Sequence, residues 1–247
     1  MNLTLDIGNT QAKLAVYNNS LVFVKTFDAK FIIDEIDDFL LLYPSIKNFI
    51  VCSVTDVDLN LDKYNFDNIH FVSENSNIPF ENLYLSKKSL GNDRIALVSS
   101  ASLSYPGKNV LIIDAGSCIT YDFINDKNQY LGGAISPGLK MRYKSLNKFT
   151  SKLPLVCLES SENLIANQTI DSINVGVVNG VVFEIEGFIS QYLAKYENLT
   201  VILTGGNSVF LSNQLKISIF ANQNFLLEGL NNLIKLNSSN WKNIYFI

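Results

Sequence analysis

The pattern of apolar and polar positions predicts a chain that begins with strands and continues with alternating strands and helices. Leu3 and Leu5 lead into a polar turn at residues 6–10, and alternation resumes from Ala12, which is typical of two half-buried strands. Apolar residues then recur at helical spacing up to Pro44, which ends that predicted helix. The further elements predicted in this half are strands at 21–27, 49–54 and 69–72 and a helix at 93–105.

The second half predicts a buried sheet and one long helix. Residues 110–113 are almost wholly apolar, as in a strand that is buried on both faces. Residues 169–195 carry the longest helical pattern, in which Gly176 and Gly180 lie one turn apart. That spacing allows another helix to approach closely, either within the chain or in a dimer. The other predicted elements are strands around 118–124, 129–135 and 199–203 and a helix from about 139, whereas the tail has no strong pattern.

Composition narrows the class of protein. The 247 residues are 47% apolar and 17% charged with a net charge of −4, which is ordinary for a well-packed soluble protein. No basic run is longer than Lys87-Lys88. Because nucleic-acid binding requires clustered lysines and arginines, it is not expected. Neither a signal peptide nor an apolar run of about 20 residues is present, so we expect a cytoplasmic protein without a membrane partner. Three widely spaced cysteines predict reduced thiols, and the single histidine, His70, predicts a structural role.

A weak internal repeat is the most informative feature of the sequence. Residues 3–8 (LTLDIG) align with residues 111–116 (LIIDAG), 108 positions later. Each copy starts on an apolar strand and continues into another strand. Two related hairpins, one in each of two domains at 1–108 and 109–247, would explain this distance.

The residues of these hairpins suit the phosphates of a nucleotide. Gly8 and Gly116 remove the side chain where the backbone approaches an anion. Asn9, Thr10 and Ser117 supply hydrogen-bond donors, whereas the carboxylates of the hairpins would repel phosphate and are better suited to hold a cation. One Asp-x-Gly turn alone would also fit an ordinary hairpin, so the second copy carries the argument.

Residues 91–94 (GNDR) lie just before a predicted helix and allow two interpretations. Asn92 or Asp93 could be an N-cap. Alternatively, Asp93 could be a general base for an attacking hydroxyl, with Arg94 binding an acidic group. Residues 132–138 (GGAISPG) and 204–206 (TGG) likewise fit either plain turns or loops that admit a ligand.

Taken together, five motifs resemble the type III pantothenate kinase family of the actin, sugar-kinase and heat-shock-chaperone ATPase superfamily. They are DIGNT at 6–10, GNDR at 91–94, DAGS at 114–117, GGAISPG at 132–138 and TGG at 204–206. The resemblance implies two ribonuclease-H-like domains facing an ATP cleft, a homodimer, and the conversion of pantothenate and ATP to 4′-phosphopantothenate and ADP with Mg²⁺ and a monovalent cation, K⁺ or NH₄⁺.

The resemblance also implies roles for individual residues. Asp93 matches the catalytic proton acceptor, and Asp114 matches the position that binds the monovalent cation, whereas Asp6 is a candidate for holding Mg²⁺ through water. The implied ATP-binding residues are Asp6, Ile7, Gly8, Asn9, Thr10, Gln11, Ala12, Lys13 and Ser117, and the implied substrate-binding residues are Tyr84, Gly91, Asn92, Asp93, Arg94 and Thr169.

Two departures from the family pattern stand beside ligand motifs. Ser117-Cys118 replaces the usual Thr-Ala, which keeps the hydroxyl, and Asn207 replaces a small residue after TGG. The alternatives that share these hairpins are another small-molecule kinase of the superfamily, acting on a sugar or acetate, and a non-enzymatic relative that regulates through protein or DNA contacts.

Overall fold

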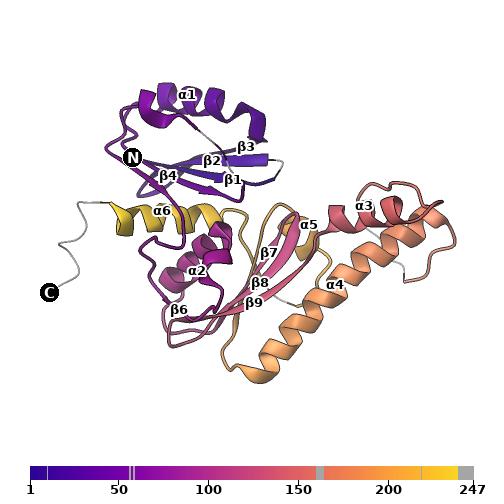
Figure 1. Ribbon diagram of the computed structural model, residues 1–247. Helices are drawn as coiled ribbons and strands as arrows, with labels where there is room; N and C mark the ends of the chain where they lie inside the picture. Colours follow the sequence, from indigo (N-terminus) through magenta and orange to yellow (C-terminus); the bar gives the residue numbers. More distant parts are fainter. Residues whose placement is uncertain (10, 56, 58, 160–163, 218, 239–247) are drawn as a thin grey trace. The chain divides into compact units, whose positions relative to one another are not determined.

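The computed structural model describes residues 1–9, 11–55, 57, 59–159, 164–217 and 219–238, and the chain forms two compact units (Figure 1). The first unit comprises residues 1–106, 128–131 and the segment from 224, and the second comprises 107–127 and 132–223. Each unit is described by itself. Two sheets with flanking helices confirm the predicted α/β class.

Most of the predicted elements are present with nearly the predicted bounds. The strands are β1 Asn2–Ile7, β2 Gln11–Asn18, β3 Ser20–Asp28, β4 Asn48–Ser53, β5 Asn68–Phe71, β6 Glu81–Asn82, β7 Val110–Ala115, β8 Cys118–Ile124, β9 Gln129–Pro137, β10 Thr200–Thr204 and β11 Phe220–Ala221. The α-helices are α1 Ile32–Leu42, α2 Asn92–Ser104, α3 Leu139–Phe149, α4 Thr169–Lys195, α5 Ser208–Ser212 and α6 Phe225–Asn237.

The first unit contains a sheet in the order β3-β2-β1-β4-β5, in which β1 is antiparallel to β2 and parallel to β4. Alternate side chains of β1 point to opposite faces. Leu3, Leu5 and Ile7 therefore pack with α1 in one buried cluster. Asp6 lies on the other face of β1, beside Cys52 in the β1–β4 register, and this is the face on which α2 and α6 contact β4.

Helix α6 differs from the sequence-based expectation. The pattern of the tail predicts no element, and the predicted domain bounds include it in the second domain, but α6 packs on α2, β1 and β4 of the first unit. At Gly229 the helices are in close contact, because an added Cβ would lie 2.9 Å from the carbonyl carbon of Ala96 in α2. The Asn2 side chain also donates to Asn231 of α6 at 2.9 Å. Tertiary packing therefore holds this helix in place.

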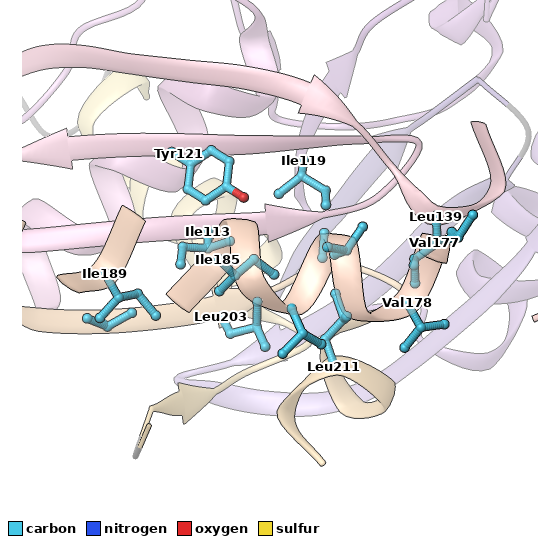
Figure 2. Close-up of a cluster of buried hydrophobic side chains, with 14 of the residues drawn as sticks. Ile113, Ile119, Tyr121, Leu139, Val177, Val178, Ile185, Ile189, Leu203 and Leu211 are labelled. Atoms are coloured by element: carbon cyan, nitrogen blue, oxygen red, sulfur yellow. The ribbon is translucent and has the colours of Figure 1, made fainter. Parts of the chain in front are cut away.

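The second sheet has the order β11-β10-β7-β8-β9-β6, and α4 covers its strands in the second unit. Figure 2 shows Ile113, Tyr121 and Leu203 of the sheet beside Val178 and Ile185 of α4. All five side chains are fully buried. The 27 residues of α4 span about 40 Å at 1.5 Å per residue, so this one helix can cover the sheet and extend beyond it to α3.

The two sheets repeat one topology, which extends the internal repeat from sequence to structure. In both, the first strand is antiparallel to the second and parallel to the fourth: β7 pairs with β8 and β10 just as β1 pairs with β2 and β4. The repeated motifs LTLDIG and LIIDAG end equivalent first strands. This order of three antiparallel strands followed by two parallel ones is the predicted ribonuclease-H-like arrangement.

Among the described residues, α4 is the one helix long and apolar enough to cross a membrane. Half of its most apolar window is buried inside the protein. Because a helix at the centre of a packed core passes the same test, this is weak evidence for a membrane span.

Candidate functional site

The ends of three elements converge in the first unit. Asp6 is next to last in β1, Ser53 ends β4, and Asn92 begins α2. The Asn92 side chain donates to the Ser53 carbonyl at 3.1 Å, which ties the start of the helix to the end of the strand. Asp93 follows at the next position and acts electrostatically on Asp6. Two predicted site carboxylates are thus brought together.

Burial and charge together make this cluster unusual. The pKa of Asp6 is raised to about 7, chiefly by burial and then by the neighbouring Asp93, whereas Lys13 opposes the shift. The same surroundings raise the pKa of the buried Cys52 thiol, chiefly by burial and then through Asp6 and Asp93. Cys52 is therefore a neutral thiol under the site, and the paired carboxylates favour a bound cation.

The N-cap interpretation of GNDR is wrong for α2. Its N-cap is Gly91, which makes no side-chain capping bond, and Asn92 is used in the bond to β4. The Asp93 carboxylate accepts the Arg94 N–H at 2.8 Å. A Cβ on Gly91 would collide with Oδ1 of Asp93, so glycine is needed there for this carboxylate position.

Arg94, next to Asp93 in the chain, forms a cation–π pair with Tyr84. The Arg94 guanidinium lies 5.4 Å from the centre of the Tyr84 ring, and Arg94 is only 5% exposed. Tyr84 stacks in turn on Tyr130, with ring centres 6.0 Å apart, and Phe80 meets the edge of Tyr130. Sequence reasoning missed Tyr130, which joins the first unit through the β6–β9 pairing; its position just before GGAISPG was the available signal.

The first glycine turn is closed by its backbone. The Gly8 N–H donates to the Gln11 carbonyl at 3.0 Å, and a Cβ on Gly8 would lie 3.2 Å from that oxygen. Asn9 and Gln11 are exposed beside the turn, and Lys13 donates to Asn224 at 3.5 Å. Ile7 and Ala12 are buried and anchor the two strands, whereas Thr10 lies outside the described residues.

The second glycine turn, in the second unit, repeats this closure. The Gly116 N–H donates to the Cys118 carbonyl at 2.9 Å, which leaves Ser117 exposed at the tip. Gly138 packs directly on this turn: its N–H donates to the Ser117 carbonyl at 3.1 Å. A Cβ on Gly138 would lie only 2.5 Å from that oxygen. Gly138 therefore serves close packing against DAGS, whereas a Cβ on Gly133 would collide with the Tyr121 carbonyl of β8.

TGG approaches the same turn from β10. Gly205 has a positive φ of 89°, and a Cβ there would collide with the Asp114 carboxylate. Asn207, which departs from the family pattern, donates its side-chain N–H to the Ala115 carbonyl at 3.2 Å and to that of Gly116 at 3.4 Å. In this chain the larger residue therefore fastens the DAGS turn.

Thr169 lies in the second unit, at the start of α4. It lines a cavity of about 770 Å³ between α3, α4 and the segment before α4. Arg142, Ser172 and Gly176 line the same cavity. The hydroxyl groups and the guanidinium of these side chains suit a polar ligand, and the cavity is large enough for a small molecule.

The donor set fits a hydrated divalent cation better than a protein-caged metal. Among the described residues, no cluster of three or more His, Cys, Asp or Glu side chains could hold a metal ion. Mg²⁺ commonly keeps several waters and binds one or two carboxylates together with substrate phosphates. Asp6, with its raised pKa beside Asp93, fits that mode.

Comparisons with known proteins agree on one family. The family model described as type III pantothenate kinase matches residues 2–191. The type III pantothenate kinase of Christiangramia forsetii is 47% identical over 97% of this chain and 100% of its own length, and that of Bacteroides fragilis strain YCH46 is 38% identical over 96% and 99%.

Two solved structures share the fold. One is a Campylobacter jejuni protein assigned to the Baf family of transcriptional activators, with TM-score 0.59, 24% identity and coverage of 94% of this chain and 97% of its own. The other is a Sinorhizobium meliloti protein assigned as a 2-dehydro-3-deoxygalactonokinase, with TM-score 0.56, 7% identity and coverage of 95% and 98%.

Proposed function

Because this chain belongs to the type III pantothenate kinase family, it phosphorylates an alcohol group, that of pantothenate, in coenzyme A biosynthesis, and we propose that Asp93 activates this alcohol. The observation that carries the assignment is the convergence of Asp93, Asp6 and Asn92 at the ends of α2, β1 and β4. A half-buried pair of carboxylates beside the Arg94 and Tyr84 side chains suits proton abstraction next to an anionic substrate.

The proposed reaction is a direct transfer. Asp93 accepts the proton of the primary hydroxyl while the hydroxyl oxygen attacks the γ-phosphorus of ATP, and ADP leaves with the electrons of the broken bond. Arg94, stacked on Tyr84, binds the substrate carboxylate, and Gly91 and Asn92 hold the adjacent backbone. Thr169 contacts the substrate from the start of α4.

We assign the ATP phosphates to the two glycine turns. Residues 6–13 provide the first phosphate segment, in which Gly8 lets the backbone approach and Lys13 offers a positive charge, and Ser117 provides a hydroxyl from the second. Mg²⁺, when bound, neutralises charge on the phosphate oxygens. Asp6 would hold it through water, and Asp114 would hold K⁺ or NH₄⁺.

The decisive experiment is a coupled assay of ADP release by the purified chain. We expect pantothenate, with ATP and Mg²⁺, to stimulate ADP formation, and K⁺ to increase it. Hexoses and acetate serve as matched acceptors, because they test the alternative kinases of the superfamily. Stimulation by a hexose or acetate and not by pantothenate would contradict the substrate, and no stimulation by any acceptor would favour a regulatory relative.

We also propose that the protein is a cytoplasmic homodimer without nucleic-acid partners. Gly176 and Gly180 support the dimer, because a Cβ added at either would meet no atom of the described residues within 4 Å. An internal close contact, which the sequence left open, is therefore not what these glycines make within the described part of the chain. Phe183 on the same helix is 56% exposed, which adds an apolar side chain to this surface.

A further inference from the structure

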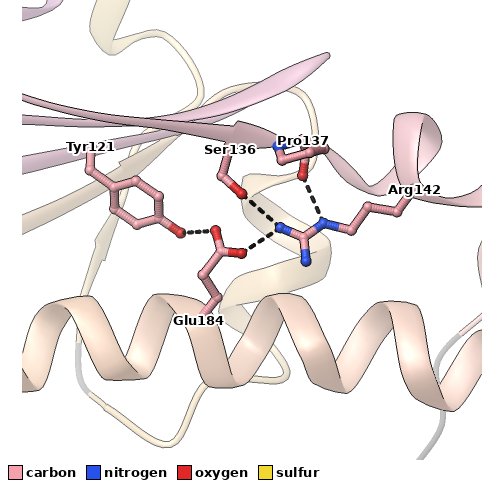
Figure 3. Close-up of polar contacts among 5 residues, drawn as sticks. All are labelled: Tyr121, Ser136, Pro137, Arg142 and Glu184. Carbon is pink, nitrogen blue, oxygen red and sulfur yellow. Dashed lines mark hydrogen bonds and ion pairs between the residues drawn. The ribbon is translucent and has the colours of Figure 1, made fainter. Parts of the chain in front are cut away.

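A polar network crosses the middle of α4, in the second unit. Figure 3 shows Glu184 between two donors. Its Oε1 accepts from the Tyr121 hydroxyl at 2.8 Å, and its Oε2 accepts from Nη2 of Arg142 at 2.5 Å. The network therefore connects β8, α3 and α4.

Arg142 extends the network to the end of β9. Its Nε donates to the Pro137 carbonyl at 2.8 Å, and its Nη2 donates to the Ser136 hydroxyl at 2.8 Å. The planar guanidinium can hold these partners in one fixed geometry, whereas an ammonium group on a flexible stem cannot. One side chain thus fixes the two residues that precede Gly138.

The ion pair at its centre is largely shielded from water. The side chains of Arg142 and Glu184 are only 22% and 23% exposed. Burial raises the pKa of Glu184, but hydrogen bonds from Arg142, Ser136 and Tyr121 outweigh that effect and leave the pKa below its usual value. Glu184 is therefore ionised at neutral pH, and loss of either partner leaves a poorly solvated charge behind.

The position of residues 136–138 matters because Gly138 rests on the second glycine turn. Its N–H donates to the Ser117 carbonyl, and there is no room for a Cβ between them. A shift of the β9–α3 corner would consequently move the Ser117 backbone. The turn has two supports. Asn207 holds one side of it, and the β9–α3 corner, which Arg142 fixes, holds the other.

We infer that Arg142 and Glu184 are positioning residues, which hold the Ser136–Gly138 corner so that the Ser117 turn is preorganised for ATP. The inference rests on the proposed function, in which Ser117 contacts the nucleotide. Neither residue touches ATP itself. Their loss should weaken nucleotide binding while leaving the substrate cluster around Asp93 intact.

The test compares Arg142→Ala and Glu184→Gln with the wild-type chain. A misplacement of about 1 Å can cost up to about 10² in rate, so we expect the ATP KM, and the Kd for ADP measured by calorimetry, to rise about tenfold. The pantothenate KM should change less than about twofold for Glu184→Gln, because Glu184, unlike Arg142, does not line the cavity beside Thr169. Because both residues act through one network, the double variant should be little worse than either single variant. Arg142→Lys should recover only part of the loss.

Controls separate this inference from the proposed function. Lys144→Ala removes a charge from an exposed position of α3, the helix that contains Arg142. It should leave the KM values for ATP and pantothenate unchanged. If Ser117→Ala does not weaken ADP binding, the assignment of Ser117 to ATP is wrong. If it does, but the Arg142 and Glu184 variants bind ADP as tightly as the wild type, the positioning role is wrong.

A milder variant covers the case in which Arg142→Ala does not fold. Tyr121→Phe removes only the hydroxyl that donates to Glu184 and keeps the ring that stacks on Phe188 with centres 4.0 Å apart. It should raise the ATP KM selectively, by a smaller factor. An equal rise in both KM values would indicate a general structural defect and contradict the inference.

Discussion

Asp93 is held by its neighbours on both sides. Gly91 gives its carboxylate room, and the Arg94 N–H donates to it. Asn92 fixes the start of α2 on β4. The residue identities in GNDR are therefore explained by one local geometry, in which every position either places the carboxylate or makes space for it.

Asp93→Asn should lower turnover about 10²–10⁴-fold, the range expected when a general base is lost. The amide has nearly the same shape as the carboxylate, so ATP binding should be largely kept. Steady-state kinetics and ADP calorimetry measure the two effects. Asp38→Asn, at an exposed position of α1, is the matched control and should behave as wild type. Near-normal turnover of Asp93→Asn would remove this residue from the mechanism.

His70 offers a pH prediction that is independent of the catalytic cluster. Burial lowers its pKa below the usual 6.5, and its Nε2 lies 2.8 Å from the Ser76 hydroxyl. A histidine whose pKa is lower in the folded state stabilises the fold above its unfolded pKa, and this contribution is lost as the pH falls through the folded value. Stability should therefore decline as the pH drops below about 6.5.

Because His70 is the single histidine of the chain, its ring resonances in an NMR titration report its pKa directly. We expect a midpoint below 6.5. Thermal unfolding of His70→Gln should show less loss of stability than the wild type over the same acidic range. A midpoint at or above 6.5 would contradict the structural account of this residue.

The sequence predicted the role of a residue best where that role follows from the residue type and from its position in a turn. DIGNT and DAGS could be interpreted because glycine and aspartate carry their chemistry locally. Tyr130 and Arg142 could not be interpreted in this way, because their roles come from partners in other elements: Tyr84 in one case and Glu184 in the other. An aromatic or an arginine alone does not specify such a partner.

At the scale of elements, a helix could be predicted from sequence where its apolar periodicity is strong, but not where its residues have weak helix propensity. The bounds of α4, predicted as 169–195, are confirmed. Helix α6 was missed because it contains Gly229 and the asparagines 231 and 232, which are poor helix formers. Its stability comes from packing on α2 and the sheet, which a local pattern cannot reveal.

Gly229→Ala tests that explanation. On helix propensity alone the change would stabilise α6 by about 1 kcal/mol, but the new Cβ would meet the backbone at Ala96 of α2. Because overpacking typically costs about 1–3 kcal/mol, we expect a net loss in the free energy of unfolding, measured by urea denaturation. Asn232→Ala, in the same helix, should instead gain a few tenths of a kcal/mol. Stabilisation by Gly229→Ala would show that α6 does not rest closely on α2.

At the scale of the whole molecule, the internal repeat was visible in sequence as six aligned residues and proved to be a repeated sheet order. The short motif is recognisable in both halves of the chain because each copy ends a first strand and begins a tight turn. The remaining strands of each half share only their topology, and topology is maintained by many different apolar residues. The residues alone therefore predicted the repeat at its turns, whereas the correspondence between the two whole sheets was implied only by the resemblance to the family.

The glycines of α4 lead to a prediction about assembly. Gly176 and Gly180 have open space beside them, and the exposed Phe183 lies on the same side of the helix by its periodicity. A helix surface of this kind allows the close approach of a second chain. We expect light scattering after size exclusion to give about twice the chain mass of 27.6 kDa.

Gly180→Leu should shift this mass towards that of the monomer, because the added side chain would separate the two helices. Asp171→Leu adds the same side chain at an exposed position of α4, on the opposite side of the helix from Gly180, and should leave the mass unchanged. Circular dichroism would check that both variants fold. If Gly180→Leu folds and retains the doubled mass, the dimer forms through another surface, and a wild-type chain of 27.6 kDa would exclude the dimer altogether.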